Sequence, residues 1–143
     1  METQHYNIYE VKFGDIENIH YMRTSFKELT EGLQDYSISK NKEALNKWIS
    51  TIESILKGAT YVRDQILQGD SVIINCSDGW DRTPQIVSLT KILLDPYYRT
   101  IEGFRILIMY EWNGFGHKFK SRQHYSNNKE SSPVFIQFVD CVN

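Results

Sequence analysis

The sequence predicts one α/β domain in which a central sheet is flanked by helices. Two short segments rich in β-branched and aromatic residues, residues 6–13 and 71–75, predict strands. Elsewhere apolar residues recur every three or four positions, which is typical of amphipathic helices. No linker or internal repeat interrupts the 143 residues, of which 41% are hydrophobic and 24% charged, as in a domain with one core. We therefore expect a single domain over residues 1–143.

The first two predicted elements are a strand and a helix. Residues 6–13 alternate loosely and are rich in Tyr, Ile and Val, so we expect a strand that ends at the turn around Gly14. Apolar residues are then spaced by three or four positions, which predicts a helix over residues 16–33 that Gly32 ends.

A longer helix and a buried strand follow the polar loop of residues 34–40. One apolar stripe runs along residues 41–68, which predicts a helix that Gly69 stops. The short apolar run within residues 71–75 is bounded by Gly-containing turns, and this pattern predicts a buried central strand.

The remaining elements are predicted to be helices. A proline suits the first turn of a helix that begins near Thr83 and ends by Asp95. Apolar residues on one face predict another helix over residues 100–112. The Ser132-Pro133 pair has the pattern of a cap and a first helical turn, so we expect a terminal helix after it.

Charge, hydropathy and cysteine usage exclude several classes of protein. A net charge of −2 with both signs mixed gives no basic field for nucleic acid. No apolar run is long enough to cross a bilayer and no secretory signal is visible, so we expect a soluble, cytoplasmic chain. Two cysteines without Cys/His spacing indicate neither disulfides nor zinc, and we expect no metal and no cofactor. We interpret His20 and His117 as structural hydrogen-bonding residues and Cys141 as a core thiol.

One loop carries the candidate chemistry. It lies between the second predicted strand and a predicted helix, where backbone amides and the helix dipole favour an anion and lower the pKa of a thiol. Cys76 is therefore a candidate thiolate nucleophile, and Arg82, six residues later, would clamp two phosphate oxygens. Gly79 permits an unusual backbone angle, and Asp81 would protonate a departing alkoxide and later activate water.

The alternative is a purely structural loop. In that interpretation Cys76 is a buried thiol, and Asp78 and Asp81 only cap the helix. A Cys and an Arg at this spacing are a weak signal alone, but the flanking β-type run, the helix and the glycine favour catalysis.

The run CSDGWDRT, residues 76–83, resembles the signature loop of the myotubularin phosphatases. Agreement over eight consecutive residues that include a Trp is rarely a chance event. Four further segments are similar to family segments in the same order: GDIENIHYMRTSF, LLDPYYRTIEGF, EWNGFGHKF and SPVFIQFVDCV. Together these segments cover nearly the whole chain.

The resemblance implies a protein-tyrosine-phosphatase-like α/β fold and metal-independent hydrolysis of the 3-phosphate of phosphatidylinositol 3-phosphate and phosphatidylinositol 3,5-bisphosphate. It implies that Cys76 forms a phosphocysteine, Arg82 holds the phosphate and Asp81 is the general acid. Because anions beside a phosphate repel it, we expect the pKa of Asp81 to be raised in the complex. The resemblance also implies a set of substrate-contacting residues: Asn18, Ile19, Ser77, Asp78, Gly79, Trp80, Asp81, Arg82, Lys118 and Arg122.

The sequence also departs from the family pattern. Asn75 stands where the family usually has His before the nucleophile, which changes one contribution to holding the thiolate. Pro84 replaces a small residue, and Lys118 stands where Arg is common. The family's N-terminal lipid-binding domain and parts of its catalytic domain have no counterpart in the 143 residues, so we expect an excised fragment or a minimal relative.

Three functions stay open at this point. The first is an active lipid 3-phosphatase; the second is a module that binds phosphoinositide without hydrolysing it, as Asn75 and the short length would allow. The third is a phosphotyrosine phosphatase, although that class usually takes its general acid from a separate loop. For the first function we expect the partner to be a phosphoinositide headgroup at an endosomal-type membrane, and the resemblance leaves a homo- or hetero-dimer open.

Overall fold

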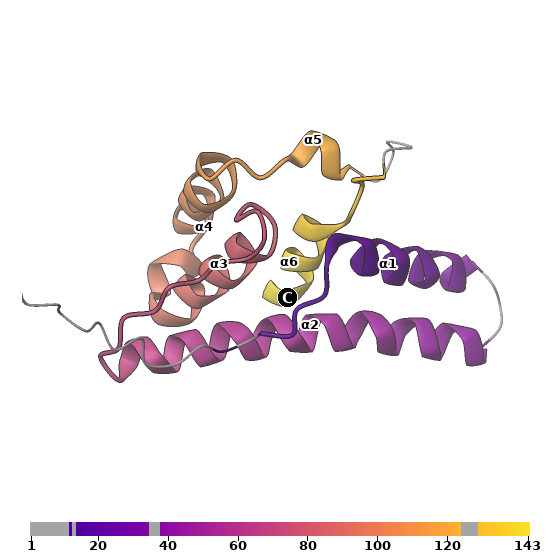
Figure 1. The fold of residues 1–143 in the computed structure, drawn as a ribbon, viewed down its shortest axis with the longest axis horizontal. Coiled ribbons are helices and arrows are strands. Elements are labelled where there is room, and N and C mark those ends of the chain that lie inside the picture. The colour runs from indigo at the N-terminus through magenta and orange to yellow at the C-terminus, as the bar shows by residue number, and fades with distance from the viewer. Residues whose placement is uncertain (1–11, 13, 35–37, 124–128) are drawn as a thin grey trace, which may run out of the picture.

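The computed structural model describes residues 12, 14–34, 38–123 and 129–143, and this part of the chain is built from helices and loops (Figure 1). The helices are α1 (Ile19–Gln34), α2 (Ile38–Leu67), α3 (Arg82–Leu94), α4 (Ile101–Leu107), α5 (Phe119–Arg122) and α6 (Val134–Val142). A 3₁₀ turn, η1 (Pro96–Arg99), precedes α4, and a π-helical turn, η2 (Ile108–Gly114), continues it. None of the described helices is long and apolar enough to cross a membrane.

The predicted central sheet is wrong for the described residues, because they contain no strand. Residues 71–75 form a segment without regular secondary structure between α2 and the loop that precedes α3. Val72 and Ile74 pack on the core, whereas the side chain of Ile73 is 93% exposed. The alternation expected of a strand is therefore present, but a strand also needs a neighbouring backbone to take its hydrogen bonds, and the described residues provide none. Of the other predicted strand, residues 6–13, only Lys12 is described.

The first two helices lie side by side, and α2 runs along one whole side of the molecule (Figure 1). Helix α1 begins at Ile19, later than predicted, because the Asn18 Oδ1 atom accepts the backbone N–H groups of His20 (2.9 Å) and Tyr21 (3.2 Å) as a cap. Gly32 does not end α1. A Cβ atom there would lie 2.9 Å from Asn41 Oδ1, so the glycine allows close packing of α1 against α2.

The core is formed by residues of α1, α2, α3, α4, η2 and α6. Its buried hydrophobic residues are Met22, Ile55, Ala59, Val62, Ile86, Leu89, Leu107, Trp112, Val134 and Phe138. A buried polar chain crosses it: the Gln85 Nε2 group donates to Gln137 Oε1 (2.9 Å), and Gln137 Nε2 donates to Thr51 Oγ1 (2.8 Å). Because unpaired polar groups are costly to bury, these bonds fix how α2, α3 and α6 align.

The C-terminal half of the chain confirms the predicted helices with small changes of boundary. The Thr100 Oγ1 atom caps α4 by accepting the Gly103 backbone N–H at 3.0 Å. A Cβ atom at position 103 would lie 2.0 Å from the carbonyl oxygen of Tyr97, so this close approach requires glycine. In α6 the cap residue is Pro133 and not Ser132, so the helix begins at Val134, one residue later than predicted.

Candidate active site

The loop between the extended segment and α3 folds back over the sulfur of Cys76. The backbone of Gly79 has φ 84°, a conformation that favours glycine, and its N–H group donates to the Cys76 sulfur at 3.2 Å. Arg82 is the first residue of α3, so the positive end of that helix lies beside the loop. The thiol therefore lies just before a helix N-terminus, as predicted, but the segment that precedes it is not the predicted strand.

The surroundings of Cys76 favour its thiolate. Burial opposes the charged form, but the hydroxyl and backbone N–H of Thr83 and the backbone N–H groups of Asp78 and Gly79 outweigh it. The pKa of Cys76 is lowered from its ordinary value of 9.0 to about 7. The loop therefore favours ionisation of this thiol at a lower pH than that of an ordinary cysteine, as a nucleophilic cysteine requires.

Arg82 spans two segments that are far apart in the sequence. Its guanidinium donates to Ser77 Oγ at 3.0 Å and to the carbonyl oxygen of Ile16 at 3.3 Å. A cavity of about 270 Å³ lies at this junction, lined by Asn18, Ile19, His20, Cys76, Ser77, Asp78, Asp81 and Arg82. The residue before α1 and the residues of the loop thus face one small polar space.

Asp81 is held by two partners from the segment before and within α5. Its carboxylate accepts from Arg122 Nε (3.0 Å) and Nη2 (2.8 Å), and His117 Nδ1 lies 3.3 Å from Oδ1. Burial raises the pKa of Asp81, but the bonds from His117 and Arg122 outweigh it, and the pKa is lowered. This direction is opposite to the one that we predict for the complex with a phosphate.

The other predicted contacts divide into two groups. The Lys118 ammonium lies 4.1 Å from the centre of the Trp80 ring, a cation–π contact beside the loop. Arg122 is buried and does not line the cavity; besides Asp81 it donates to the carbonyl oxygen of Glu130 at 3.0 Å. The structure therefore brings the loop, Asn18 and Ile19 together, whereas Arg122 reaches the site through Asp81.

Two residues at the site are histidines that the sequence indicated only as structural. His20 lines the cavity, and His117 Nδ1 lies 2.7 Å from the carbonyl oxygen of Trp80. The FGH segment pointed to this region, but spacing alone does not reveal which atoms a buried imidazole contacts. Within the described ranges, no cluster of three His, Cys, Asp or Glu residues is arranged to hold a metal ion.

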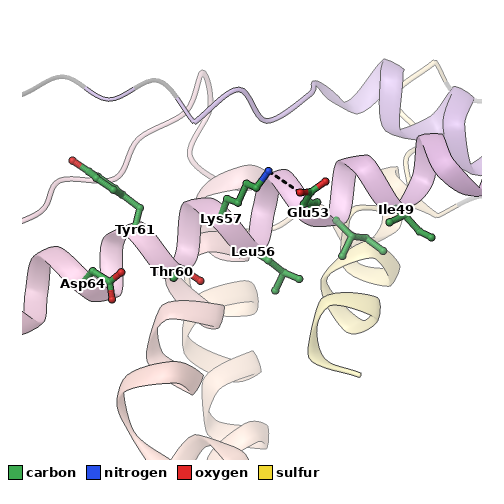
Figure 2. Close-up of a pocket in the computed structure, with 8 residues that line it drawn as sticks. Ile49, Glu53, Leu56, Lys57, Thr60, Tyr61 and Asp64 are labelled. Carbon is green, nitrogen blue, oxygen red and sulfur yellow. Dashed lines mark ion pairs between the residues drawn. The ribbon is translucent and has the colours of Figure 1, made fainter.

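A second hollow lies on the outer side of α2, away from this chemistry. Figure 2 shows its walls, which all come from α2, and the ion pair between Lys57 and Glu53, 2.7 Å long. Its volume is about 520 Å³, and its lining is Ile49, Ile52, Glu53, Leu56, Lys57, Thr60, Tyr61 and Asp64. No cysteine, histidine or arginine lines it, so the small cavity at Cys76 is the better candidate site.

Comparison with known proteins identifies relatives over the whole chain. The family model "Myotubularin-like phosphatase domain" matches residues 1–143. The chain is 43% identical over 142 residues to "Myotubularin" of Xenopus laevis, covering 93% of this chain and 23% of that protein. It is 39% identical over 150 residues to "Phosphatidylinositol-3,5-bisphosphate 3-phosphatase MTMR6" of Caenorhabditis elegans, covering 99% of this chain and 22% of that protein.

A human relative, "Phosphatidylinositol-3,5-bisphosphate 3-phosphatase MTMR4", is 43% identical over 147 residues, which cover 97% of this chain and 12% of that protein. The chain thus spans less than a quarter of the length of each of these relatives. A family match over all 143 residues accompanies a loop that stabilises a thiolate beside an arginine. The chain therefore belongs to the family of myotubularin-like phosphatases.

Proposed function

We propose that this chain carries the catalytic centre of a cysteine-dependent phosphatase that removes the 3-phosphate of phosphatidylinositol 3-phosphate and phosphatidylinositol 3,5-bisphosphate. The observation that carries the proposal is the Gly79 N–H group donating to the Cys76 sulfur, in a loop that lowers the pKa of this thiol to about 7. The names of two relatives support the choice of substrate, since both are called phosphatidylinositol-3,5-bisphosphate 3-phosphatases.

The proposed reaction has two steps. The Cys76 thiolate attacks phosphorus, so that a sulfur–phosphorus bond forms and the bond between phosphorus and the inositol oxygen breaks. Arg82 would exchange its contacts with Ser77 and Ile16 for two phosphate oxygens, and Asp81 would give a proton to the departing oxygen. Water then attacks the phosphocysteine, Asp81 takes up its proton, and inorganic phosphate leaves with the thiolate restored.

The walls of the cavity suggest how the headgroup binds. Asn18 and Ile19 face the same space as Cys76, so in this proposal one side of the inositol ring would lie against the start of α1. Lys118, held over Trp80, would supply a cation for a further phosphate or for the diester. Because Arg122 is committed to Asp81, a direct contact between Arg122 and the headgroup would require that pair to open. A substrate of this class lies at a membrane surface, so we propose that the chain acts there.

A second candidate function is binding of the headgroup without turnover. It is favoured by the state of Asp81, whose two carboxylate oxygens are both engaged and whose pKa is lowered, so that the free site holds no protonated acid. In this case the loop would grip a phosphate through its amides and Arg82 and stop there.

Phosphate release from a panel of substrates separates these functions. The purified chain is incubated with short-chain phosphatidylinositol 3-phosphate, with the 4- and 5-phosphate isomers and with a phosphotyrosine peptide, alongside Cys76→Ser as a control. We expect release from the 3-phosphate, reduced by at least about a thousandfold in Cys76→Ser. Headgroup binding without release would support the binding function, and a preference for phosphotyrosine would reject the lipid as substrate.

A further inference from the structure

His117 lies at a junction between the loop and the rest of the fold. Its side chain is 1% exposed, and its Nδ1 atom faces the carbonyl oxygen of Trp80 at 2.7 Å and Asp81 Oδ1 at 3.3 Å. The carbonyl oxygen can only accept a hydrogen bond, and so can the ionised Asp81 carboxylate. The hydrogen must therefore lie on Nδ1 of His117. One N–H group thus serves the backbone of one loop residue and the side chain of the next.

The imidazole ring has little freedom to move. It meets Trp112 edge to face, with ring centres 4.8 Å apart, and Phe119 in the same way at 4.7 Å. The backbone N–H of His117 donates to the carbonyl oxygen of Trp112 at 2.8 Å. Trp112 is itself fully buried and donates from Nε1 to Ser88 Oγ, so the position of the His117 ring is set by the core.

From these contacts we propose that His117 is a positioning residue for the phosphatase centre: its Nδ1–H group fixes the end of the Cys76 loop and the orientation of the Asp81 carboxylate. The inference rests on the proposed function and assigns His117 no contact with substrate. His117 acts with Arg122, which holds the other side of the same carboxylate. Both residues belong to one short segment, so this segment sets the place at which Asp81 meets a substrate.

The arrangement also links His117 to the protonation of Asp81. The groups that act on the carboxylate are His117 and Arg122, and Arg122 is in turn influenced by Glu130 and Asp78; Cys76 and Arg82 share its cavity. After burial, which raises the pKa of Asp81, the bond from His117 is the foremost of the effects that lower it. Removal of this N–H donor therefore raises the pKa of Asp81, and the protonated acid persists to higher pH.

Three variants distinguish the effect of the His117 Nδ1–H donor from the effect of the packed aromatic ring. His117→Phe keeps an aromatic ring against Trp112 and Phe119 but has no donor. In His117→Asn the amide nitrogen can occupy the place of Nδ1, whereas in His117→Gln the longer side chain places it near Nε2. The Asp81 carboxyl is titrated by its ¹³C chemical shift in the full chain, assigned with Asp81→Asn, and kcat is measured against pH with short-chain phosphatidylinositol 3-phosphate.

We expect the Asp81 titration midpoint to rise in His117→Phe and His117→Gln and to stay near that of the wild type in His117→Asn. The kcat of the first two should fall by about a hundredfold with little change in KM, because the acid is misplaced while the phosphate loop still binds. Equal loss in the Asn and Phe variants, or an unchanged Asp81 titration in His117→Phe, would overturn the proposal. The titration needs no turnover, so a wild-type chain that released no phosphate would refute the proposed function separately.

Discussion

The two cysteines of this chain lie in regions that shift the pKa of a thiol in opposite directions. Burial disfavours the thiolate at both positions. At Cys76 the backbone N–H groups of the loop and Thr83 outweigh burial, and the pKa falls to about 7. At Cys141, in α6, the charge of Asp140 adds to burial, and the pKa rises to about 12. What differs is the direction of the backbone: the loop points N–H groups at sulfur, whereas inside a helix these groups are already used.

The neighbouring carboxylates sharpen the contrast. The Asp81 carboxylate faces the Arg122 guanidinium, so that a cation compensates its charge. Asp140 accepts the indole N–H of Trp48 at 2.8 Å, a neutral donor that leaves the negative charge near sulfur. The charge of Asp140 therefore adds to the effect of burial at Cys141, whereas Arg122 and His117 compensate the charge of Asp81 in the region of Cys76.

The largest effect expected from this comparison is in the rate of alkylation. With a gap of about five pKa units between the two thiols, Cys76 should react with iodoacetamide in the native chain with a midpoint near pH 7, and Cys141 should stay unmodified over hours. Mass spectrometry of digested peptides over a pH series measures both sites. In Thr83→Val the Cys76 midpoint should move up toward 9, because the hydroxyl that supports the thiolate is gone.

Two controls test whether the difference in alkylation rate comes from the folded surroundings of each thiol. Cys141→Ser should leave the Cys76 midpoint unchanged, and denatured chain should show both thiols reacting alike. A native chain in which both cysteines react at the same pH would show that the loop gives Cys76 no special stabilisation.

The sequence predicted the helices well, but it also predicted a central sheet that the described residues do not contain. The apolar stripe of residues 41–68 is a local pattern, and α2 forms with nearly those boundaries. The alternating run of residues 71–75 is also local, but pairing is not: a strand exists only if another backbone lies beside it, and the described part of the chain offers none. The prediction that Gly32 ends α1 was wrong, because this glycine allows close contact with α2 and does not stop the helix.

At the site the sequence indicated candidate residues but not the contacts between them. The spacing of Cys76 and Arg82 around a glycine predicted a loop that curls around a phosphate, and in the structure this loop folds over the Cys76 sulfur. The family resemblance implies that Arg122 contacts the headgroup, which stays a prediction. The structure adds a pairing of Arg122 with Asp81 that the sequence did not indicate, since two residues 41 positions apart meet only through the tertiary fold. The contact between His117 and Asp81 could not be predicted from the sequence either, because no local pattern indicates it.

A smaller effect should follow from removal of the cation that compensates Asp81. Both side chains of the Arg122–Asp81 pair are 7% exposed, so Arg122→Met leaves a buried carboxylate with His117 as its remaining partner. We expect unfolding in urea at pH 7 to become easier by about 3 kcal/mol. The Cys76 alkylation midpoint should also rise, because Asp81 then resembles Asp140 beside Cys141.

The pH dependence of this loss has a definite sign. The pKa of Asp81 in the folded chain is lowered below its ordinary value of 3.8, so its pairing stabilises the fold above that pH and is lost as the pH falls through the folded value. The deficit of Arg122→Met should therefore be largest at neutral pH and shrink below about pH 4. A deficit that is constant from pH 7 to pH 3 would show that lost packing, and not charge, is responsible.

The smallest effect on stability is expected for substitution of Asp140, the carboxylate next to Cys141. Asp140→Ala removes the acceptor of the Trp48 indole N–H, and Trp48 is 3% exposed, so we expect a loss of about 1 kcal/mol in urea unfolding. Asp140→Asn keeps an acceptor oxygen without the charge and should retain most of this stability. Neither variant should make Cys141 react as Cys76 does, because burial is the foremost cause of its high pKa. If loss of the charge alone made Cys141 reactive, the carboxylate and not the backbone would be what separates the two thiols.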